Sequence, residues 1–128
     1  MQRAARGTIA AIAIGGALGA PARYGIAEAV HVTPGSFPWA TFVTNVSGCL
    51  AIGLLAVVLI NRPRHPLVRP FLVTGFLGAF TTFSTFAVDI DVLGKDGHLG
   101  VAGAYVVASI AAGLAAVVGG MRAGRALG

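Results

Sequence analysis

Three long stretches of this 128-residue sequence carry no Asp, Glu, Lys or Arg. They lie between Glu28 and Arg62, between Arg69 and Asp89, and between His98 and Arg122. Only 10% of all residues are charged, against about 25% in a typical soluble domain. A bilayer core of about 30 Å requires roughly 20 apolar helical residues. We therefore expect membrane-spanning helices over residues 39–60, 70–88 and 99–121.

Residues 8–30 form a fourth apolar segment, which ends less cleanly because it contains Pro21, Arg23 and Glu28. The alternative interpretation is a secretory signal peptide, since Arg3 and Arg6 precede the apolar run and "APA" resembles a cleavage site. A remainder with three long spans would still be a membrane protein. We expect the segment to be retained, giving one four-span domain over residues 1–128.

The basic residues are distributed unevenly between the two ends of the four spans. If the spans alternate, seven arginines lie on the side of both termini, and only Arg23 and Lys95 lie on the other. Short loops rich in Lys and Arg remain in the cytoplasm. We therefore expect both termini to be cytoplasmic in a multi-pass protein of the inner (plasma) membrane, surrounded by lipid.

Several function classes lack support. Cys49 lies in a span and His31, His65 and His98 lie in three different loops, so a metal site with Cys/His spacing is not indicated. The glycine-rich stretches lack the Lys-Ser/Thr ending of a phosphate-binding loop. The net charge of +5 comes from arginines at span ends, which report membrane topology rather than nucleic-acid binding.

The segment "GFLGAFTTFSTF", Gly75–Phe86, combines glycines, hydroxyls and aromatic residues inside the third span. Glycine has weak helix propensity, and Ser and Thr can satisfy backbone groups that a break would free, so we expect the third helix to be broken near Gly78. Phe83 and Phe86 fall on nearly one face, where their positive ring edges could attract an anion. The alternative is that these residues only allow tight helix packing.

Three stretches, "GGALGAPARY" (Gly15–Tyr24), "FVTNVSGCLAIG" (Phe42–Gly53) and the Gly75–Phe86 segment, resemble in order and spacing the signature stretches of the CrcB/Fluc fluoride channel family. The resemblance covers essentially the whole chain. It implies an all-α membrane protein with four transmembrane helices that assembles as an antiparallel dimer. It also implies two narrow fluoride pores and a structural sodium ion at the dimer centre.

The same resemblance implies roles for individual residues. Main-chain carbonyls of Gly78 and Thr81 would hold the sodium ion, and two chains would supply four oxygens. Asn45 would donate to fluoride, and Thr82 and Ser84 are further candidate donors. The remaining expected pore residues are the aromatic pair Phe83 and Phe86, Arg23 near the vestibule, and Tyr105 and Ser109 along a polar track in the last span. Asp89 and Gly113 depart from the family pattern.

We expect a fluoride-selective channel that exports cytoplasmic fluoride passively and confers fluoride resistance, and not an enzyme. Fluoride is strongly hydrated, so a narrow pore has to replace its water with hydrogen-bond donors. The alternative is a proton-coupled exporter similar to the small multidrug resistance family, which would require a membrane-embedded carboxylate such as Glu28. A third possibility is a scaffold subunit without transport.

The partner chain is a further open question at the level of the sequence. A homodimer of antiparallel chains needs one polypeptide to insert in both directions, which the distribution of seven basic residues against two disfavours. We expect an antiparallel dimer either of two copies or of this chain with a homologous chain of opposite charge bias.

Overall fold

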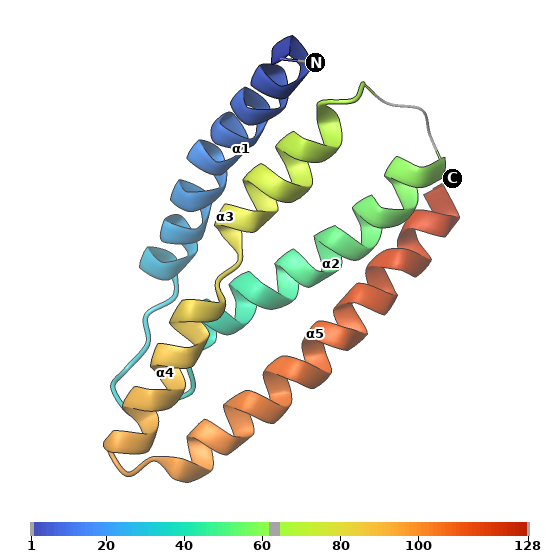
Figure 1. Ribbon diagram of the computed structural model, residues 1–128. Helices are drawn as coiled ribbons and strands as arrows, with labels where there is room; N and C mark the ends of the chain where they lie inside the picture. The colour runs from blue at the N-terminus through green and yellow to red at the C-terminus, as the bar shows by residue number, and fades with distance from the viewer. Residues whose placement is uncertain (1, 62–64, 128) are drawn as a thin grey trace.

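The computed structural model describes residues 2–61 and 65–127, and every regular element in these residues is helical. The elements in chain order are α1 (Gln2–Ala29), α2 (Trp39–Asn61), the π-helical η1 (Pro70–Leu77), α3 (Gly78–Phe80), α4 (Phe83–Lys95) and α5 (Leu99–Leu127). Figure 1 shows η1, α3 and α4 following one another as the third span. Arg62 and Arg64, which count toward the predicted charge asymmetry, lie outside the described residues.

The four predicted spans are confirmed as helices long and apolar enough to cross a membrane. They are Ala4–Ala29, Trp39–Asn61, Pro70–Lys95 and Leu99–Leu127. Each of them extends beyond the apolar stretch from which it was predicted, the second by a single residue. Hydrophobicity marks the part of a helix that lies in the bilayer core, whereas helical hydrogen bonding can continue into the interface.

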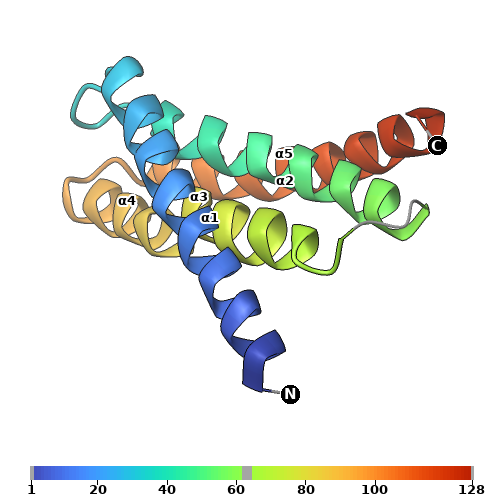
Figure 2. The same ribbon diagram turned by 90° about the horizontal axis from the view of Figure 1, so that it is seen from above.

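The spans form two closely packed pairs. In Figure 1, α2 and α5 run side by side, and the view in Figure 2 and the contacts between these two helices agree. α1 packs instead on η1 and α3, and from above it crosses them at a steep inclination (Figure 2). The third span therefore has α1 on one side, while its other side faces α2.

Glycines bring the backbones of both pairs into direct contact. A Cβ atom at Gly15 or Gly19 of α1 would overlap main-chain atoms of Phe71 or Phe76 in the third span. A Cβ at Gly53 of α2 would likewise overlap the carbonyl of Val117 in α5. Small residues allow such close approach between membrane helices. A Cβ at Gly75 would overlap the carbonyl of Ile12 in α1 in the same way, whereas one at Gly78 would not, so tight packing accounts for Gly75 of the Gly75–Phe86 segment.

The third span is interrupted at Thr81 and Thr82, three residues after the position predicted from the sequence. Gly78 is helical, with φ −63° and ψ −32°. Thr81 (φ −79°, ψ 156°) and Thr82 (φ −147°, ψ 118°) are extended. The hydroxyl of Thr82 accepts from the backbone N–H of Thr85 and caps α4. A side-chain cap fixes where a helix begins, whereas low helix propensity at Gly78 only makes a break less costly.

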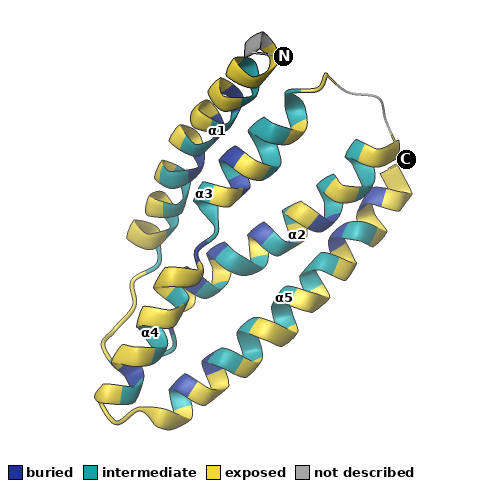
Figure 3. Cartoon of the chain, viewed as in Figure 1, coloured by how far each residue is buried: buried dark blue, intermediate teal, exposed yellow. Residues whose placement is uncertain are grey.

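The outer surface is largely apolar, as a protein surrounded by lipid requires. Exposed residues, yellow in Figure 3, lie along all the long helices, and they include Ile9, Ile14 and Leu18 of α1. Few side chains are fully enclosed within the chain; Tyr105 and Thr44 are the largest of these among the described residues. Packing between helices is therefore carried mainly by backbone and small residues.

Candidate functional site

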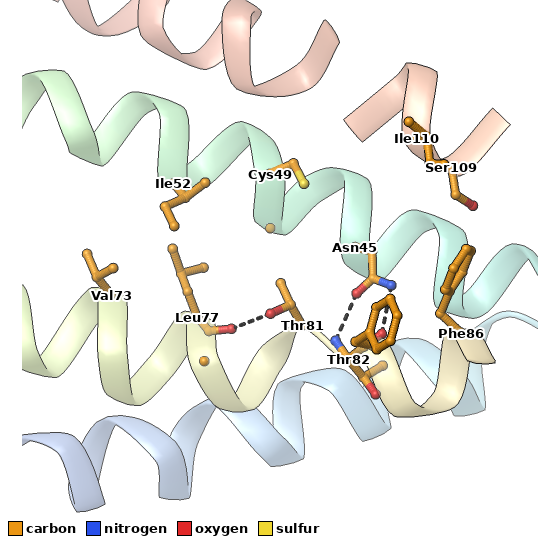
Figure 4. Close-up of a pocket in the computed structure, with 13 residues that line it drawn as sticks. Asn45, Cys49, Ile52, Val73, Leu77, Thr81, Thr82, Phe86, Ser109 and Ile110 are labelled. Carbon is orange, nitrogen blue, oxygen red and sulfur yellow. Dashed lines mark hydrogen bonds between the residues drawn. The ribbon is translucent and has the colours of Figure 1, made fainter. Parts of the chain in front are cut away.

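A cleft of about 440 Å³ opens between α2, the third span and α5. Figure 4 shows side chains from all three directed toward it. Most of its lining is apolar, including Ile52, Val73 and Leu77. Seven of the residues predicted from the sequence line it: Asn45, Gly78, Thr81, Thr82, Phe83, Phe86 and Ser109.

The polar part of the cleft lies at the break in the third span. The carboxamide Nδ2 of Asn45 donates to the carbonyl of Thr82 at 2.9 Å, and the N–H of Thr82 donates to Oδ1 of Asn45, also at 2.9 Å. Figure 4 shows this pair of bonds joining α2 to the break. Both polar groups of the Thr82 backbone are therefore satisfied by one side chain, as buried peptide groups in a membrane require.

The hydroxyls around the break are bonded to one another and to nearby backbone. Thr82 Oγ1 donates to Thr85 Oγ1 at 2.9 Å and lies 3.2 Å from Ser84 Oγ. Thr81 Oγ1 donates to the carbonyl of Leu77 at 2.9 Å. These side chains stabilise the ends of α3 and α4. The sequence analysis predicted this role, in which hydroxyls satisfy backbone groups near a break.

The break also changes which carbonyls receive helical hydrogen bonds. In a continuous helix the N–H of Thr82 would donate to the carbonyl of Gly78, and the N–H of Thr85 to that of Thr81. Here those two N–H groups donate to Asn45 Oδ1 and Thr82 Oγ1 instead. Gly78 borders the cleft, and the space beside its Cα is open, since a Cβ atom added there would have Val73 O as its nearest neighbour at 3.8 Å. These two carbonyls are oxygen ligands of the type that a hard cation prefers.

An aromatic series leads from the cleft into the protein. The rings of Phe83 and Phe86 have centroids 5.9 Å apart and are inclined at 42°. The ring centroids of Phe86 and Tyr105 are 5.1 Å apart, and those of Tyr105 and Phe37 are 5.2 Å apart. The planes of the Tyr105 and Phe37 rings are inclined at 84°, so these two rings meet edge to face. Phe83 is 80% exposed although it is a large apolar side chain. Both phenylalanines predicted to form a pair are thus neighbours on the cleft.

Tyr105 is completely buried and does not itself line the cleft. Its hydroxyl donates to Oδ2 of Asp89 at 3.1 Å. Asp89 borders a second, more polar pocket of about 410 Å³, at the C-terminal end of α1 and the start of α2, which Glu28, His31 and Thr41 also line. Tyr105 therefore lies between an aromatic surface on one side and a carboxylate on the other.

Ser109 of α5 carries a buried hydroxyl that has no hydrogen-bond partner among the described residues. Ser109 lines the cleft, and Figure 4 shows its side chain on the same side of it as Phe86. Leaving a buried hydroxyl unpaired costs about 1–3 kcal/mol. The hydroxyl is therefore a hydrogen-bond donor available to something that enters the cleft.

Three of the predicted site residues, Arg23, Ser84 and Tyr105, do not line the cleft, and one contributor was not predicted. Arg23 is half-buried in α1 and lines neither cavity. Ser84 reaches the site only through Thr82. Phe37, which contacts Tyr105, was not predicted as a site residue because it stands among turn residues outside the predicted spans. An aromatic between prolines beside a span was the signal available.

The side chains offer no conventional metal centre. Within residues 2–61 and 65–127 there is no group of three or more His, Cys, Asp or Glu side chains that could hold a metal ion. Any cation at this site would depend on main-chain carbonyls such as those of Gly78 and Thr81.

The sequence of this chain matches a known protein family. Residues 10–121 match the family model described as CrcB-like protein, Camphor Resistance (CrcB). The chain is 49% identical over 121 residues to "Fluoride-specific ion channel FluC" of Paracoccus denitrificans, covering 94% of this chain and 96% of that protein. It is also 49% identical to "Fluoride-specific ion channel FluC 1" of Streptomyces coelicolor, over 85% of this chain and 71% of that protein.

A relative with lower sequence identity is matched over a similar share of the chain. "Fluoride-specific ion channel FluC" of Rhizobium etli is 40% identical over 91% of this chain and 94% of its own length. The matches include all four helical spans and the break between α3 and α4. The chain therefore belongs to the CrcB-like family.

Proposed function

We propose that this chain is a fluoride-selective ion channel through which cytoplasmic fluoride leaves the cell passively. Its relatives are named as fluoride-specific ion channels, and its four apolar spans suit a membrane channel. The observation that carries the proposal within the structure is the unpaired hydroxyl of Ser109 beside the Phe83 and Phe86 rings. Export of fluoride in this way gives resistance to the ion.

The lining of the cleft suits a small anion that has to lose water. The hydroxyl of Ser109 replaces one hydrogen bond of the hydration shell. The positive edges of Phe83 and Phe86 add weaker attraction without a full positive charge that would trap the ion. The ring of Tyr105 neighbours that of Phe86, and Thr82, whose hydroxyl lies 3.2 Å from Ser84 Oγ, lines the same cleft. Arg23, which lines neither cavity of this chain, is proposed to supply positive charge at the vestibule of the assembled dimer.

The protein is a channel and not an enzyme, as the names of its relatives indicate. The alternative of a proton-coupled exporter of cationic drugs is not favoured. That chemistry needs a carboxylate inside the transport site. Glu28 is exposed and lines the second pocket, and the residues that line the cleft in the described chain include no carboxylate.

A sodium ion at the centre of a dimer is the second part of the proposal. The carbonyls of Gly78 and Thr81 lose their helical donors at the break, which supports their assignment as ligands. One chain supplies only two such oxygens, so a second chain has to complete the coordination. We therefore propose a dimer of antiparallel chains in which the ion is structural.

The charge bias bears on the identity of the second chain. We propose insertion in the inner (plasma) membrane with both termini inside, and a homologous chain of opposite bias as partner. Cysteines introduced singly between Asn61 and Arg69 should be labelled from one side only when this chain is expressed alone. Labelling from both sides, together with fluoride efflux by this chain alone, would instead establish a homodimer of two orientations.

Fluoride efflux from liposomes of phosphatidylethanolamine and phosphatidylglycerol containing the purified protein tests the function. Rapid loss of fluoride with little loss of chloride is the expected result. Transport of a lipophilic cation against a proton gradient would favour the exporter, and absence of any flux would favour a scaffold subunit. If this chain needs a partner, the efflux is measured after co-expression with a homologous chain.

A further inference from the structure

Asn45 bonds to both polar backbone groups of Thr82, the N–H and the carbonyl, at the break in the third span. Its carboxamide donates to Thr82 O and accepts from Thr82 N, each at 2.9 Å, across 37 positions of sequence. The side chain thus replaces the helical partners that Thr82 lacks. We infer that Asn45 is a positioning residue, which acts on the pore by fixing the break in the third span through Thr82 rather than primarily by contacting fluoride.

The first effect of this clamp concerns Gly78. The Thr82 N–H that would continue the helix by donating to the Gly78 carbonyl is held by Asn45 Oδ1. Without Asn45 this N–H would be unpaired in a buried segment, since Thr82 is only 6% exposed. Loss of the Asn45 bond would cost about 1–3 kcal/mol and destabilise the extended conformation of Thr82. Asn45 therefore stabilises the break and keeps the Gly78 carbonyl without its helical donor.

The second effect concerns the aromatic pair. Thr82 is held in an extended conformation, and its hydroxyl caps α4 by accepting from Thr85 N at 3.1 Å. Phe83 is the first residue of α4, and Phe86 follows one turn later. The orientation of both rings on the cleft therefore depends on where Thr82 lies, and Thr82 is placed by Asn45.

The number of hydrogen bonds available to Asn45 limits its other roles. A carboxamide has two N–H donors and an oxygen with two acceptor positions. One donor and one acceptor position are used by Thr82. Direct donation to fluoride would have to use the single remaining N–H, so the two roles predict different responses when only the Thr82 bond is removed.

Amide hydrogen exchange in detergent-solubilised, ¹⁵N-labelled protein tests the clamp without reference to transport. In Asn45→Ala, exchange at the Thr82 N–H should accelerate roughly tenfold or more, as loss of one buried hydrogen bond predicts. The matched control is Ser47→Ala in the same helix, whose hydroxyl bonds only to Thr44 O at 3.0 Å and should leave Thr82 exchange unchanged. Unchanged exchange in Asn45→Ala would overturn the inference.

A backbone ester at Thr82 separates positioning from direct contact. Replacing Thr82 with its α-hydroxy analogue removes the N–H and leaves every side chain intact. The ester also makes the Thr81 carbonyl a weaker acceptor, so the sodium dependence of efflux is measured alongside to detect that separate effect. If Asn45 acts through Thr82, the ester and Asn45→Ala should each lower fluoride efflux at least tenfold, and the combination should be no lower than either alone. Efflux that the ester leaves unchanged, while Asn45→Ala abolishes it, would assign Asn45 to fluoride directly.

These readouts rest on the proposed function to different degrees. The efflux comparison requires that the wild-type chain conducts fluoride, whereas the exchange measurement does not. If the wild type conducts no fluoride, the proposed function fails and the exchange rate of Thr82 still decides whether Asn45 fixes the break. If Asn45→Ala does not yield a monodisperse protein, the fluoride efflux of the ester variant and its exchange at the Thr85 N–H, which donates to Thr82 Oγ1, decide the question.

Discussion

The contact of α1 with the third span and the contact of α2 with the same span use opposite means. Gly15 and Gly19 bring backbone against backbone with no side chain between them. Asn45 of α2 instead places a long polar side chain on Thr82. The first contact packs closely on a helical part of the span, and the second lies at its break. A membrane helix thus needs different neighbours where it is continuous and where it is broken.

The largest expected effect is on the tight α1 contact. Gly15→Ala places a Cβ against the carbonyl of Phe71 and should destabilise the packed protein by about 1–3 kcal/mol or prevent its assembly. The measurement is the fraction of monodisperse protein on size-exclusion chromatography. Gly25→Ala, in the same helix with no atom within 4 Å of the new Cβ, is the matched control. Equal yields from both variants would mean that the contact is not essential.

A large effect on function, without an effect on assembly, is expected at the aromatic pair. Phe83→Ile or Phe86→Ile removes the positive ring edges from the cleft and should reduce fluoride efflux about tenfold or more, which corresponds to about 1.4 kcal/mol. Phe76→Ile, which alters a stacked pair away from the cleft, serves as control. Wild-type efflux in both pore variants would assign these rings to packing.

A smaller effect is expected when the unpaired hydroxyl is removed. Ser109→Ala should lower fluoride efflux roughly three- to tenfold, because one hydrogen bond of about 1 kcal/mol to the ion is lost. Its thermal stability should be equal or higher, since a buried unsatisfied group disappears. Thr44→Ala gives the comparison, because that hydroxyl bonds to Ala40 O at 2.8 Å. Loss of stability in Ser109→Ala would show that Ser109 has a structural partner.

The smallest effect is expected at the end of α3. Thr81→Ser keeps the hydroxyl that donates to Leu77 and leaves the main-chain carbonyl in place. The sodium dependence of fluoride efflux should therefore change less than about twofold, on the expectation that only the carbonyl binds the ion. A strong shift in the sodium concentration required would mean that the methyl group, and hence the packing of Thr81, sets the site.

Much of the fold follows from the sequence because hydrophobicity alone determines which segments lie in the bilayer. The pairing of Phe83 with Phe86 was also predictable, since residues three apart share a helix face. The position of the break was not, because Gly78 and Thr82 are both compatible with one and only the capping geometry distinguishes them. The bonds of Asn45 to Thr82 depend on tertiary packing over 37 residues. No local pattern reports such a contact.

The glycine contacts also determine how this sequence can vary. Every substitution of glycine adds at least one carbon atom, so at Gly15, Gly19 and Gly53 almost no single-codon change is neutral. Lipid-facing positions such as Ile9 and Leu18 have no such constraint, because many apolar side chains are interchangeable there. A library of all single substitutions would therefore show a few sharply intolerant positions within long tolerant stretches. The positions at which the fold most restricts the choice of amino acid are therefore those with the smallest side chains.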